Sequence, residues 1–414
     1  MRRILIIGAG QAGALLALGL QVRGYDVTLV SDRTPLEIRQ GRVMSSQCLF
    51  GTALAIEREL GLDWGGLCPP IDGVAFNVPD LRRPSTQAIG WRAALDEPAM
   101  SVDQRLKIPA WISDFAERGG RVLHARAGLS DVERWCGEHE LVVVATGRGG
   151  LSQLFERDAA RSPFHQPQRT VALTYVHGMA PDIGPSAVHF NLVPGVGEYF
   201  VFPALVAGGD CDVMVFEALP GGPMDGWAKV ATPAEHLAHS RHLLKRFLPL
   251  EAERCRHVEL TDALGTLVGA ITPTVRHPLG RLPGGPVVLG MGDAVVLNDP
   301  ITGQGANSAV RCARMYEEAI VEQGDRPFDE AFMQRAFDRW WWQHARHVTA
   351  WTHAMLAPTR PHALALMDAA ATLPALARRL ANGFDRPDDA AAILLTPEGA
   401  AAALADAGEV PSNA

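Results

Sequence analysis

Residues 4–13 read ILIIGAGQAG, and this stretch decides the fold. Its four aliphatic residues, Ile4–Ile7, are typical of a strand that is buried on both faces of a parallel sheet. The Ala/Leu-rich segment 14–21 is expected to be helical, and a second strand is expected over 26–30, shortly before Asp32. A strand, a G-x-G-x-x-G turn, a helix, a second strand and an acid, in this order, predict a dinucleotide-binding α/β unit.

The three glycines of the turn have different mechanical roles. Gly8 permits the tight turn, Gly10 removes the side chain that would block a pyrophosphate, and Gly13 lets the helix and the strand pack closely. The free N–H groups at the start of the helix and the positive end of its dipole point at the phosphates. Asp32 is expected to accept hydrogen bonds from the adenosine ribose, or else to be a helix cap or a solvated residue in a turn. The residues expected at the dinucleotide are Gly8, Gly10, Gln11, Ala12, Gly13, Asp32 and Arg33.

A second glycine-rich junction between a strand and a helix lies almost three hundred residues downstream. The apolar run 286–290 is followed by GDA at 292–294, by DPITGQGAN at 299–307, and by a helical pattern to about residue 322. The first fingerprint alone does not distinguish NAD from FAD. Because FAD is long and has two ends to hold, a chain that returns to the same sheet favours FAD. The alternative is an ordinary tight turn before a capped helix.

Length and composition limit the class of protein. With 414 residues the chain exceeds one typical domain, so two intimately packed domains are expected. The net charge is −8 and no run of Lys or Arg occurs, which argues against nucleic acid or an anionic membrane as the main partner. No apolar stretch is long enough to span a bilayer. The six cysteines are scattered without a C-x-x-C pair or zinc spacing, which favours a reduced, cytoplasmic protein without a metal site.

The GDA and DPITGQGAN segments resemble the second FAD motif of the flavoprotein aromatic hydroxylases. The resemblance implies an α/β fold, with a glutathione-reductase-type Rossmann-like FAD-binding domain, an inserted β-sheet substrate domain and C-terminal helices. It also implies that the acid of GDA contacts the ribityl and pyrophosphate portion, and that the later loop runs beside the isoalloxazine ring. Matched by position, the cofactor-binding residues of this motif are Asp293, Pro300, Gly303, Gln304, Gly305, Ala306 and Asn307.

Two segments in the middle of the chain are similar to further parts of the same family. SVDQRLKIP resembles a helix whose arginine lies along the FAD phosphates, and Arg105 is the candidate. A surface ion pair of Arg105 with Asp103 or Glu117 is the alternative. LVVVATG resembles a strand end that passes near the cofactor, which adds Thr146 and Gly147. A buried strand with a glycine turn would give the same pattern as this second segment.

Over nearly its whole length the sequence resembles the epoxidase component of the styrene/indole monooxygenase family. The similar stretches include IIGAGQAG, DVTLVSDR, GRVMSS, LVVVATGRGGL, SPFHQPQR and GMGDAVVLNDPITGQGAN. The resemblance implies a two-component FAD-dependent monooxygenase, to which a separate NAD(P)H-dependent flavin reductase supplies reduced FAD in a transient encounter. Oxygen is then the co-substrate. The implied substrate is a small hydrophobic aromatic such as a styrene or an indole, which is converted by epoxidation, hydroxylation or sulfoxidation. The sequence leaves open whether the protein forms a homodimer.

Three other functions stay open on the sequence. A self-sufficient NAD(P)H-dependent hydroxylase would carry an Asp-Gly signature where this chain has TGRGG at 146–150, and no second nucleotide fingerprint is found. Another FAD oxidoreductase, such as an oxidase or a reductase, could use the same fold. A non-catalytic FAD-binding protein is the third alternative.

The active-site segment of the family has Arg, two apolar residues and Asn, whereas this chain has RVMS at 42–45. Arg42 is expected to keep a flavin-proximal role, and Ser45 in place of Asn leaves the substrate open. A substrate pocket is expected between the flavin and a sheet over 168–220. Its candidate residues are Ser45, His189, Asn191, Phe200 and Phe202, although alternation does not say which face lines the pocket. We nominate no catalytic acid–base pair, and His189 is expected to be hydrogen-bonded structure.

The predicted domain organisation follows from these motifs. The FAD-binding domain is expected over 1–75, 100–165 and 260–325, the substrate-binding domain over 76–99 and 166–259, and a C-terminal helical segment over 326–414. The histidines of that last segment are not expected to bind a metal, because no acid or cysteine is spaced to complete a site.

Overall fold

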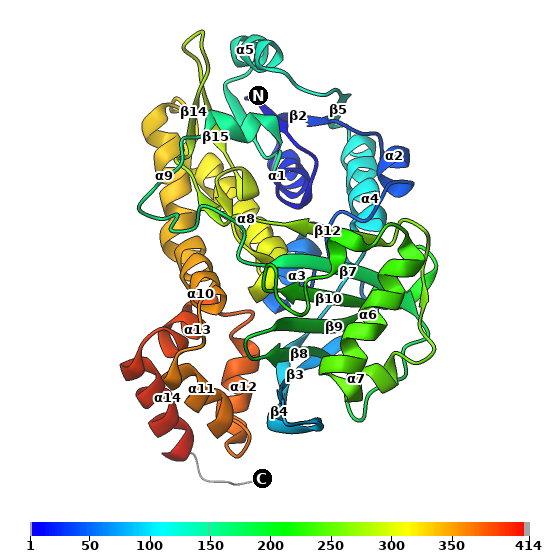
Figure 1. Cartoon of the computed structure of the whole chain (residues 1–414). Coiled ribbons are helices and arrows are strands. Elements are labelled where there is room, and N and C mark those ends of the chain that lie inside the picture. Colours follow the sequence, from blue (N-terminus) through cyan, green and yellow to red (C-terminus); the bar gives the residue numbers. More distant parts are fainter. Residues whose placement is uncertain (1, 148, 410–414) are drawn as a thin grey trace.

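The computed structural model describes residues 2–147 and 149–409, and Figure 1 shows its elements. The first large sheet has six strands: β1 (Arg3–Ile7), β2 (Asp26–Ser31), β5 (Arg121–His124), β6 (Leu141–Val144), β14 (Leu279–Arg281) and β15 (Val287–Gly290). Their order is β14-β15-β6-β1-β2-β5, and all neighbours are parallel except β14 and β15. β1 lies in the middle, with Ile4 opposite Val27 of β2 and Leu141 of β6. The central strands are runs of Ile, Leu and Val because they are covered on both faces.

Helices from both ends of the chain cover this sheet. α1 (Gln11–Val22) packs against α8 (Gly305–Gln323) and against α4 (Gln104–Glu117), as Figure 1 shows. Trp111 of α4 and Tyr316 of α8 are among the largest fully buried side chains. Shorter helices complete this part: α2 (Pro35–Arg39), α3 (Gly51–Glu59) and α5 (Leu129–Glu138). The N-terminal and C-terminal thirds of the sequence therefore form one core.

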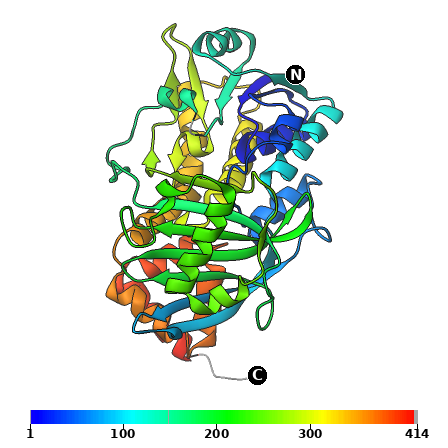
Figure 2. The same ribbon diagram turned by 45° about the vertical axis from the view of Figure 1, so that its right-hand side comes forward.

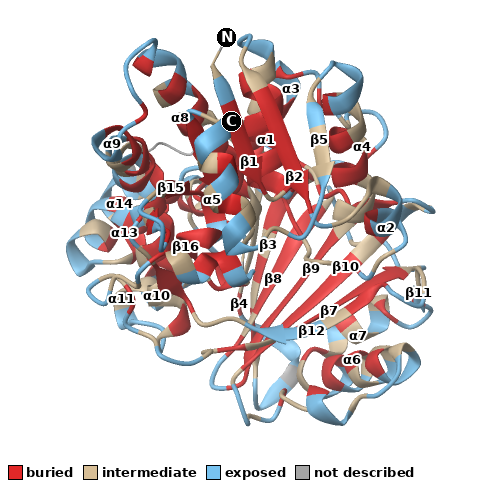
Figure 3. Ribbon diagram, turned by 90° about the horizontal axis from the view of Figure 1, so that it is seen from above, coloured by how far each residue is buried: buried red, intermediate tan, exposed pale blue. Residues whose placement is uncertain are grey.

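The second large sheet lies beside the first and is built mostly from the middle of the chain. Its strands are β3 (Ile71–Asp80), β4 (Arg83–Ala99), β7 (Thr170–His177), β8 (Ala187–Val193), β9 (Gly197–Val206), β10 (Gly209–Ala218), β11 (Glu259–Leu260) and β12 (Thr266–Ala270). They follow the order β11-β7-β10-β9-β8-β3-β4, with β12 also paired to β7. α6 (Pro233–Phe247) and α7 (Pro249–Arg254) cover one face of this sheet (Figure 2). Figure 3 shows that β8, β9 and β10 are buried along most of their length.

The chain ends in a helical segment, coloured orange to red in Figure 1. Its helices are α9 (Glu330–Trp340), α10 (Arg346–Leu356), α11 (Pro361–Ala369), α12 (Pro374–Asn382), α13 (Pro387–Leu394) and α14 (Pro397–Glu409), with a π-helical turn between α9 and α10. α12 packs against β4, and Asn382 Oδ1 accepts from the Asp96 N–H at 2.7 Å. Among residues 2–147 and 149–409, no single helix has the length and apolarity to cross a membrane. The pair α13 and α14 reaches them only together, across a bend of 106°.

The α/β fold class predicted from the sequence is confirmed. The strands predicted over 4–7, 26–30 and 286–290 correspond to β1, β2 and β15, and the two predicted glycine-rich junctions lead into α1 and α8. A small two-stranded sheet of β13 (Thr274–Val275) and β16 (Val296–Leu297) was not predicted. β12 joins the second sheet although it falls in the region expected to bind FAD, and the domain division stays a prediction.

Candidate functional site

A cavity of about 1160 Å³ lies between the two large sheets. On one side it is lined by residues at the carboxyl ends of β1, β2 and β6, which is where open parallel sheets bind their ligands. On the other side it is lined by residues of β8, β9 and β10. Its volume exceeds the roughly 300–1,000 Å³ typical of a pocket for one drug-sized molecule. The cavity therefore has room for an elongated ligand together with a smaller one.

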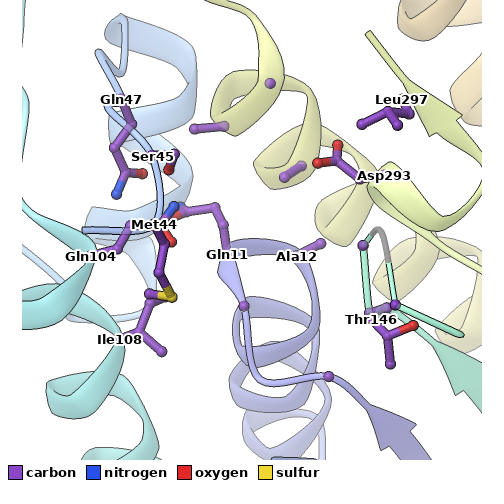
Figure 4. Close-up of a pocket in the computed structure, with 18 of the residues that line it drawn as sticks. Gln11, Ala12, Met44, Ser45, Gln47, Gln104, Ile108, Thr146, Asp293 and Leu297 are labelled. Carbon is purple, nitrogen blue, oxygen red and sulfur yellow. The ribbon is translucent and has the colours of Figure 1, made fainter. Parts of the chain in front are cut away.

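The three fingerprint glycines meet different surroundings. A Cβ on Gly8, whose φ is +114°, would lie 2.5 Å from the Ala145 carbonyl oxygen, so the tight turn requires glycine. A Cβ on Gly13 would lie 1.9 Å from the Gly8 carbonyl oxygen, so this glycine allows close packing and does not line the cavity. A Cβ on Gly10 would have no protein atom within 4 Å, because Gly10 borders the cavity. The start of α1, with Gln11 and Ala12, faces the same space in Figure 4.

Asp32 and Arg33, at the end of β2, line the cavity as predicted for the adenosine end. The Asp32 carboxylate is exposed and lies 3.6 Å from Arg33 Nε, and Arg33 Nη2 reaches Met44 Sδ at 3.0 Å. The loop 125–128 after β5 also borders this end, which the sequence reasoning missed. Its Ala-Arg-Ala-Gly composition carries no motif, so only the position of β5 beside β2 could have indicated it.

The second glycine-rich junction meets the same cavity from the C-terminal third of the chain. Asp293 follows β15 in a short 3₁₀ turn and lies across from Thr146, as Figure 4 shows. Gly147 has φ +62°, and a Cβ there would come within 4.0 Å of the Asp293 Cβ. The loop that leads into α8 adds four more predicted residues to the wall, namely Pro300, Gly303, Gly305 and Ala306. The free N–H groups at the start of α8 therefore face the cavity, as those of α1 do.

Gln304 and Asn307 belong to the same motif but do not line the cavity. Gln304 is buried and donates from Nε2 to the Phe384 carbonyl oxygen at 2.8 Å. Asn307 Nδ2 donates to the Cys48 carbonyl oxygen at 2.9 Å, and its Oδ1 accepts from the Phe50 N–H at 3.0 Å. The structure thus places these two side chains as cross-links that hold the cavity wall.

Two arginines expected at the flavin lie elsewhere. Arg105 does not reach the cavity wall, because Asp103 and Asp262 bind its guanidinium at 2.7 and 3.0 Å. These two carboxylates hold the Arg105 pKa above its ordinary value. Arg42 is exposed and donates to the Thr266 carbonyl oxygen at 3.0 Å, outside the cavity. The structure therefore corrects the flavin-proximal placement of both residues, and Gln104 lines the wall instead.

The second sheet presents an apolar wall to the cavity. Val188, Phe190, Phe200, Phe202 and Val215 line it, and the rings of Phe190 and Phe200 pack edge-to-face at 4.6 Å. Phe200 and Phe202 are therefore where the sequence analysis expected them. Ser45 also lines the cavity, beside Met44 and Gln47 in Figure 4, and its carbonyl oxygen accepts from the Tyr175 hydroxyl at 3.2 Å.

His189 and Asn191 do not line the cavity, so their assignment to the substrate pocket is wrong. Along β8 they alternate with Val188 and Phe190, which do line the cavity. His189 Nδ1 lies 2.7 Å from Glu251 Oε1, and its Nε2 lies 2.9 Å from Asp182 Oδ2. The expectation that His189 is hydrogen-bonded structure agrees with these contacts. Asn191 Oδ1 accepts from Asn77 Nδ2 at 2.8 Å.

A buried polar chain behind the fingerprint was also missed. Gln11 Nε2 donates to Glu57 Oε1 at 2.7 Å, and Lys107 Nζ donates to the same oxygen at 2.6 Å. The side chains of Glu57 and Lys107 are only 1% and 2% exposed. Because Gln11 lines the cavity, this ion pair fixes a side chain at the start of α1. A buried lysine has no signature in the sequence, since its partner lies 50 residues away.

The residues present fit FAD. The cavity extends from Asp32 to the second glycine-rich junction, so it can hold both ends of a long dinucleotide. Two helix starts face it, and Gly10 leaves open the place that a side chain would fill. The Gln11 Oε1 atom is buried without a protein partner in the described part of the chain, as expected where a ligand supplies the bond. Fold and cavity together define a flavoprotein oxidoreductase with a Rossmann-like FAD-binding domain.

Comparison with known proteins narrows this class. Residues 147–254 match the family described as "Styrene monooxygenase A putative substrate binding domain". The styrene monooxygenase StyA of Pseudomonas fluorescens is 28% identical over 401 residues, which cover 94% of each protein. The chain is therefore similar in sequence to the styrene monooxygenases, a group of flavoprotein monooxygenases, over nearly its whole length.

Two solved structures share the fold at low sequence identity. A flavoprotein/dehydrogenase from Cytophaga hutchinsonii superposes with a TM-score of 0.67 at 14% identity, over 96% of this chain and 95% of that one. The flavin-dependent brominase Bmp2 gives a TM-score of 0.61 at 16% identity, over 98% of this chain and 92% of that one. These likenesses concern the fold alone.

Proposed function

We propose that this protein is the oxygenase of a two-component system, and that a separate NAD(P)H-dependent flavin reductase supplies it with reduced FAD. It inserts one oxygen atom of O₂ into a small hydrophobic aromatic substrate such as a styrene or an indole. When bound in its reduced form, FAD activates O₂ for this transfer. The observation that carries the proposal is the cavity, in which a glycine-lined cradle for a dinucleotide is continuous with an aromatic wall.

The chain's own residues supply binding and orientation. Gly10 and the start of α1 would hold the pyrophosphate, and Asp293 with Thr146 would hold the portion between the phosphates and the flavin ring. The loop from Pro300 to Gly303 and the start of α8 would flank the ring, where N–H groups at a helix start stabilise negative charge. All of these groups belong to the cavity wall.

The apolar wall supports the exclusion of water from the reaction. Phe190, Phe200 and Phe202 of the second sheet face the cavity, and Phe384 of the C-terminal segment lines it as well. Phe384 stacks on Phe50, with ring centroids 5.4 Å apart, so two distant parts of the chain meet at this wall. A dry wall protects the oxidising equivalent from loss to water and favours an apolar aromatic substrate. No acid–base residue is required for this role.

A single-turnover experiment tests the proposal. The protein is loaded with chemically reduced FAD without oxygen, then mixed with oxygenated buffer that contains styrene, catalase and no NAD(P)H. We expect styrene oxide in up to one equivalent per FAD by chromatography. We also expect no product from NADH and oxidised FAD until a flavin reductase is added. As a matched control, Phe200→Trp should keep the FAD affinity but lower the yield, because the larger ring occupies the aromatic wall.

Each alternative function predicts a different result. Product from NADH without any reductase would show a self-sufficient hydroxylase. With catalase omitted, reoxidation of bound FAD with stoichiometric hydrogen peroxide, and no product from styrene, indole or an aryl sulfide, would favour an oxidase or a reductase. Failure to bind FAD at micromolar concentration would leave a non-catalytic scaffold.

A further inference from the structure

An acidic side chain lies in the apolar wall of the cavity. Glu217, near the end of β10, lines the cavity next to the aromatic residues and is 1% exposed. On the same face of β10 it follows Val215, and across the strand pair Val215 is opposite Phe200. Both neighbours line the cavity too. A carboxyl group in such a wall loses its hydration and needs a polar partner.

The partner available to Glu217 within the protein is a second acid. Asp299 also lines the cavity and is 2% exposed, and its Oδ1 accepts the Ile301 N–H at 3.2 Å. Burial raises the pKa of Glu217 well above its ordinary value, and the neighbouring Asp299 raises it further. Burial also raises the pKa of Asp299, but the contact with Glu217 lowers it in part, so a proton shared by the two carboxyl groups lies mainly on Glu217. Apart from this proton, neither Glu217 oxygen has a hydrogen-bond partner among the residues that the structure describes.

The nearby cation, Arg169, is already paired with another carboxylate. Arg169 Nε and Nη2 bind the two oxygens of Glu198 at 2.7 and 2.9 Å, and Arg169 Nη1 donates to the Gln168 carbonyl oxygen at 3.0 Å. The charged groups that act on the acid pair are therefore Arg169 and Glu198, which neutralise each other. The acid pair is left with acceptor oxygens that no donor from the described chain fills.

We propose that the Glu217–Asp299 pair is a specificity-determining acceptor site, which binds an N–H or O–H group on an otherwise apolar aromatic ligand. The inference rests on the proposed function in taking the ligand of this wall to be an aromatic substrate. Val215 and Glu217 are two residues apart on one strand, so their side chains stand about 7 Å apart on the same face. A ring that packs on Val215 and Phe200 therefore has one edge directed toward Glu217. A plain hydrocarbon leaves the acceptor buried without a donor, whereas a ligand with a donor satisfies it.

Indole and indene test this site, because they have nearly the same shape and only indole has an N–H. The dissociation constant of each is measured by equilibrium dialysis against the wild-type protein loaded with oxidised FAD. We expect indole to bind about tenfold more tightly than indene, the ratio that corresponds to one hydrogen bond of about 1.4 kcal/mol. 1-Methylindole should bind like indene. Equal affinity for indole and 1-methylindole would overturn the proposal without any variant.

Two variants of Glu217 give a matched comparison. Glu217→Gln keeps an acceptor oxygen at the same place and should keep the preference for indole within about threefold. Glu217→Met has a similar size and no acceptor, and it should reduce the indole-to-indene ratio to about one. A preference that persists in Glu217→Met would show that Glu217 is not the acceptor, and a preference that persists in a Glu217→Met/Asp299→Leu double variant would overturn the site as a whole. The apparent FAD affinity of each variant checks that its cavity is intact.

The binding experiment is independent of oxygen insertion. Oxidised FAD supports no turnover, so the indole preference can be present even if the single-turnover experiment yields no product. Conversely, styrene oxide formation together with equal binding of indole and 1-methylindole would refute the acceptor site alone.

Discussion

The replacement of Gly10 by alanine separates ligand binding from folding at the fingerprint. Gly10 has φ −80° and ψ −170°, a conformation open to any residue, and the new methyl group would meet no protein atom within 4 Å. The free energy of unfolding of the FAD-free protein should therefore stay the same or rise by up to about 1 kcal/mol, because alanine restricts the unfolded chain. In the cavity the methyl group takes the place expected for the pyrophosphate. Such overlap costs about 1–3 kcal/mol, so FAD should bind roughly 10- to 100-fold more weakly.

Gly13→Ala is the matched control, since it makes the same change three residues later. Its Cβ would lie 1.9 Å from the Gly8 carbonyl oxygen, and the close helix–strand contact cannot admit it. We expect this variant to lose about 3 kcal/mol or more of unfolding free energy. Urea unfolding of FAD-free protein measures stability, and quenching of FAD fluorescence measures affinity. Wild-type FAD affinity in Gly10→Ala, or a loss of stability as large as in Gly13→Ala, would refute the reasoning.

Three further predictions concern buried charge. Lys107→Met should lower the unfolding free energy by about 3–5 kcal/mol, because it leaves Glu57 buried without its cation. Combining it with Glu57→Leu should restore most of this loss. A cost of Lys107→Met below about 1 kcal/mol in urea unfolding would contradict the prediction. Burial lowers the pKa of His236 from 6.5 to about 4, so the unfolded chain takes up the proton first. The stability that His236 contributes is complete above pH 6.5 and is lost as the pH falls toward 4. Over this range the wild type should lose about 3 kcal/mol of unfolding free energy relative to His236→Gln. An equal pH dependence of urea unfolding in both proteins would refute this prediction. Arg105→Ala should destabilise the protein, because Asp103 is left buried and without its cation. The same variant should change the FAD dissociation constant by less than about threefold. A loss of FAD affinity of about tenfold at unchanged stability would instead place Arg105 at the phosphates.

Local sequence order predicted the fold because the two glycine-rich junctions are local signals. A strand, a glycine turn and a helix are adjacent in the chain, so the bounds of β1, α1, β15 and α8 follow from nearby residues. The sequence was less able to predict which side chains of the second sheet line the cavity. Alternation along β8 separates Val188 and Phe190 from His189 and Asn191, but which set faces the cavity depends on α6 and α7 packing on the other face.

Long-range partners account for the rest of the differences. Arg105 is turned from the cavity partly by Asp262, which is 157 residues away, and no pattern in the sequence indicates that pairing. Glu217 did leave a signal, since an acid inside the apolar run VMVFEA is unusual for a buried strand. Its partner Asp299 precedes the glycine-rich loop, and only the folded chain brings the two together.

The first sheet joins strands from both ends of the sequence, and this sets the timing of folding on the ribosome. β1, β2 and β6 can pair once residue 144 has emerged, but β15 follows much later. At about 5–20 residues per second, synthesis from Val144 to Val287 takes roughly 7–30 s. During that time β6 is an unpaired, valine-rich edge, which is the kind of surface that aggregates or recruits chaperones. The pocket for FAD closes later still, when the loop at Pro300 and the ring of Phe384 arrive. Flavin supply during expression should therefore raise the yield of folded protein, because FAD binds only the completed chain and draws the folding equilibrium toward it.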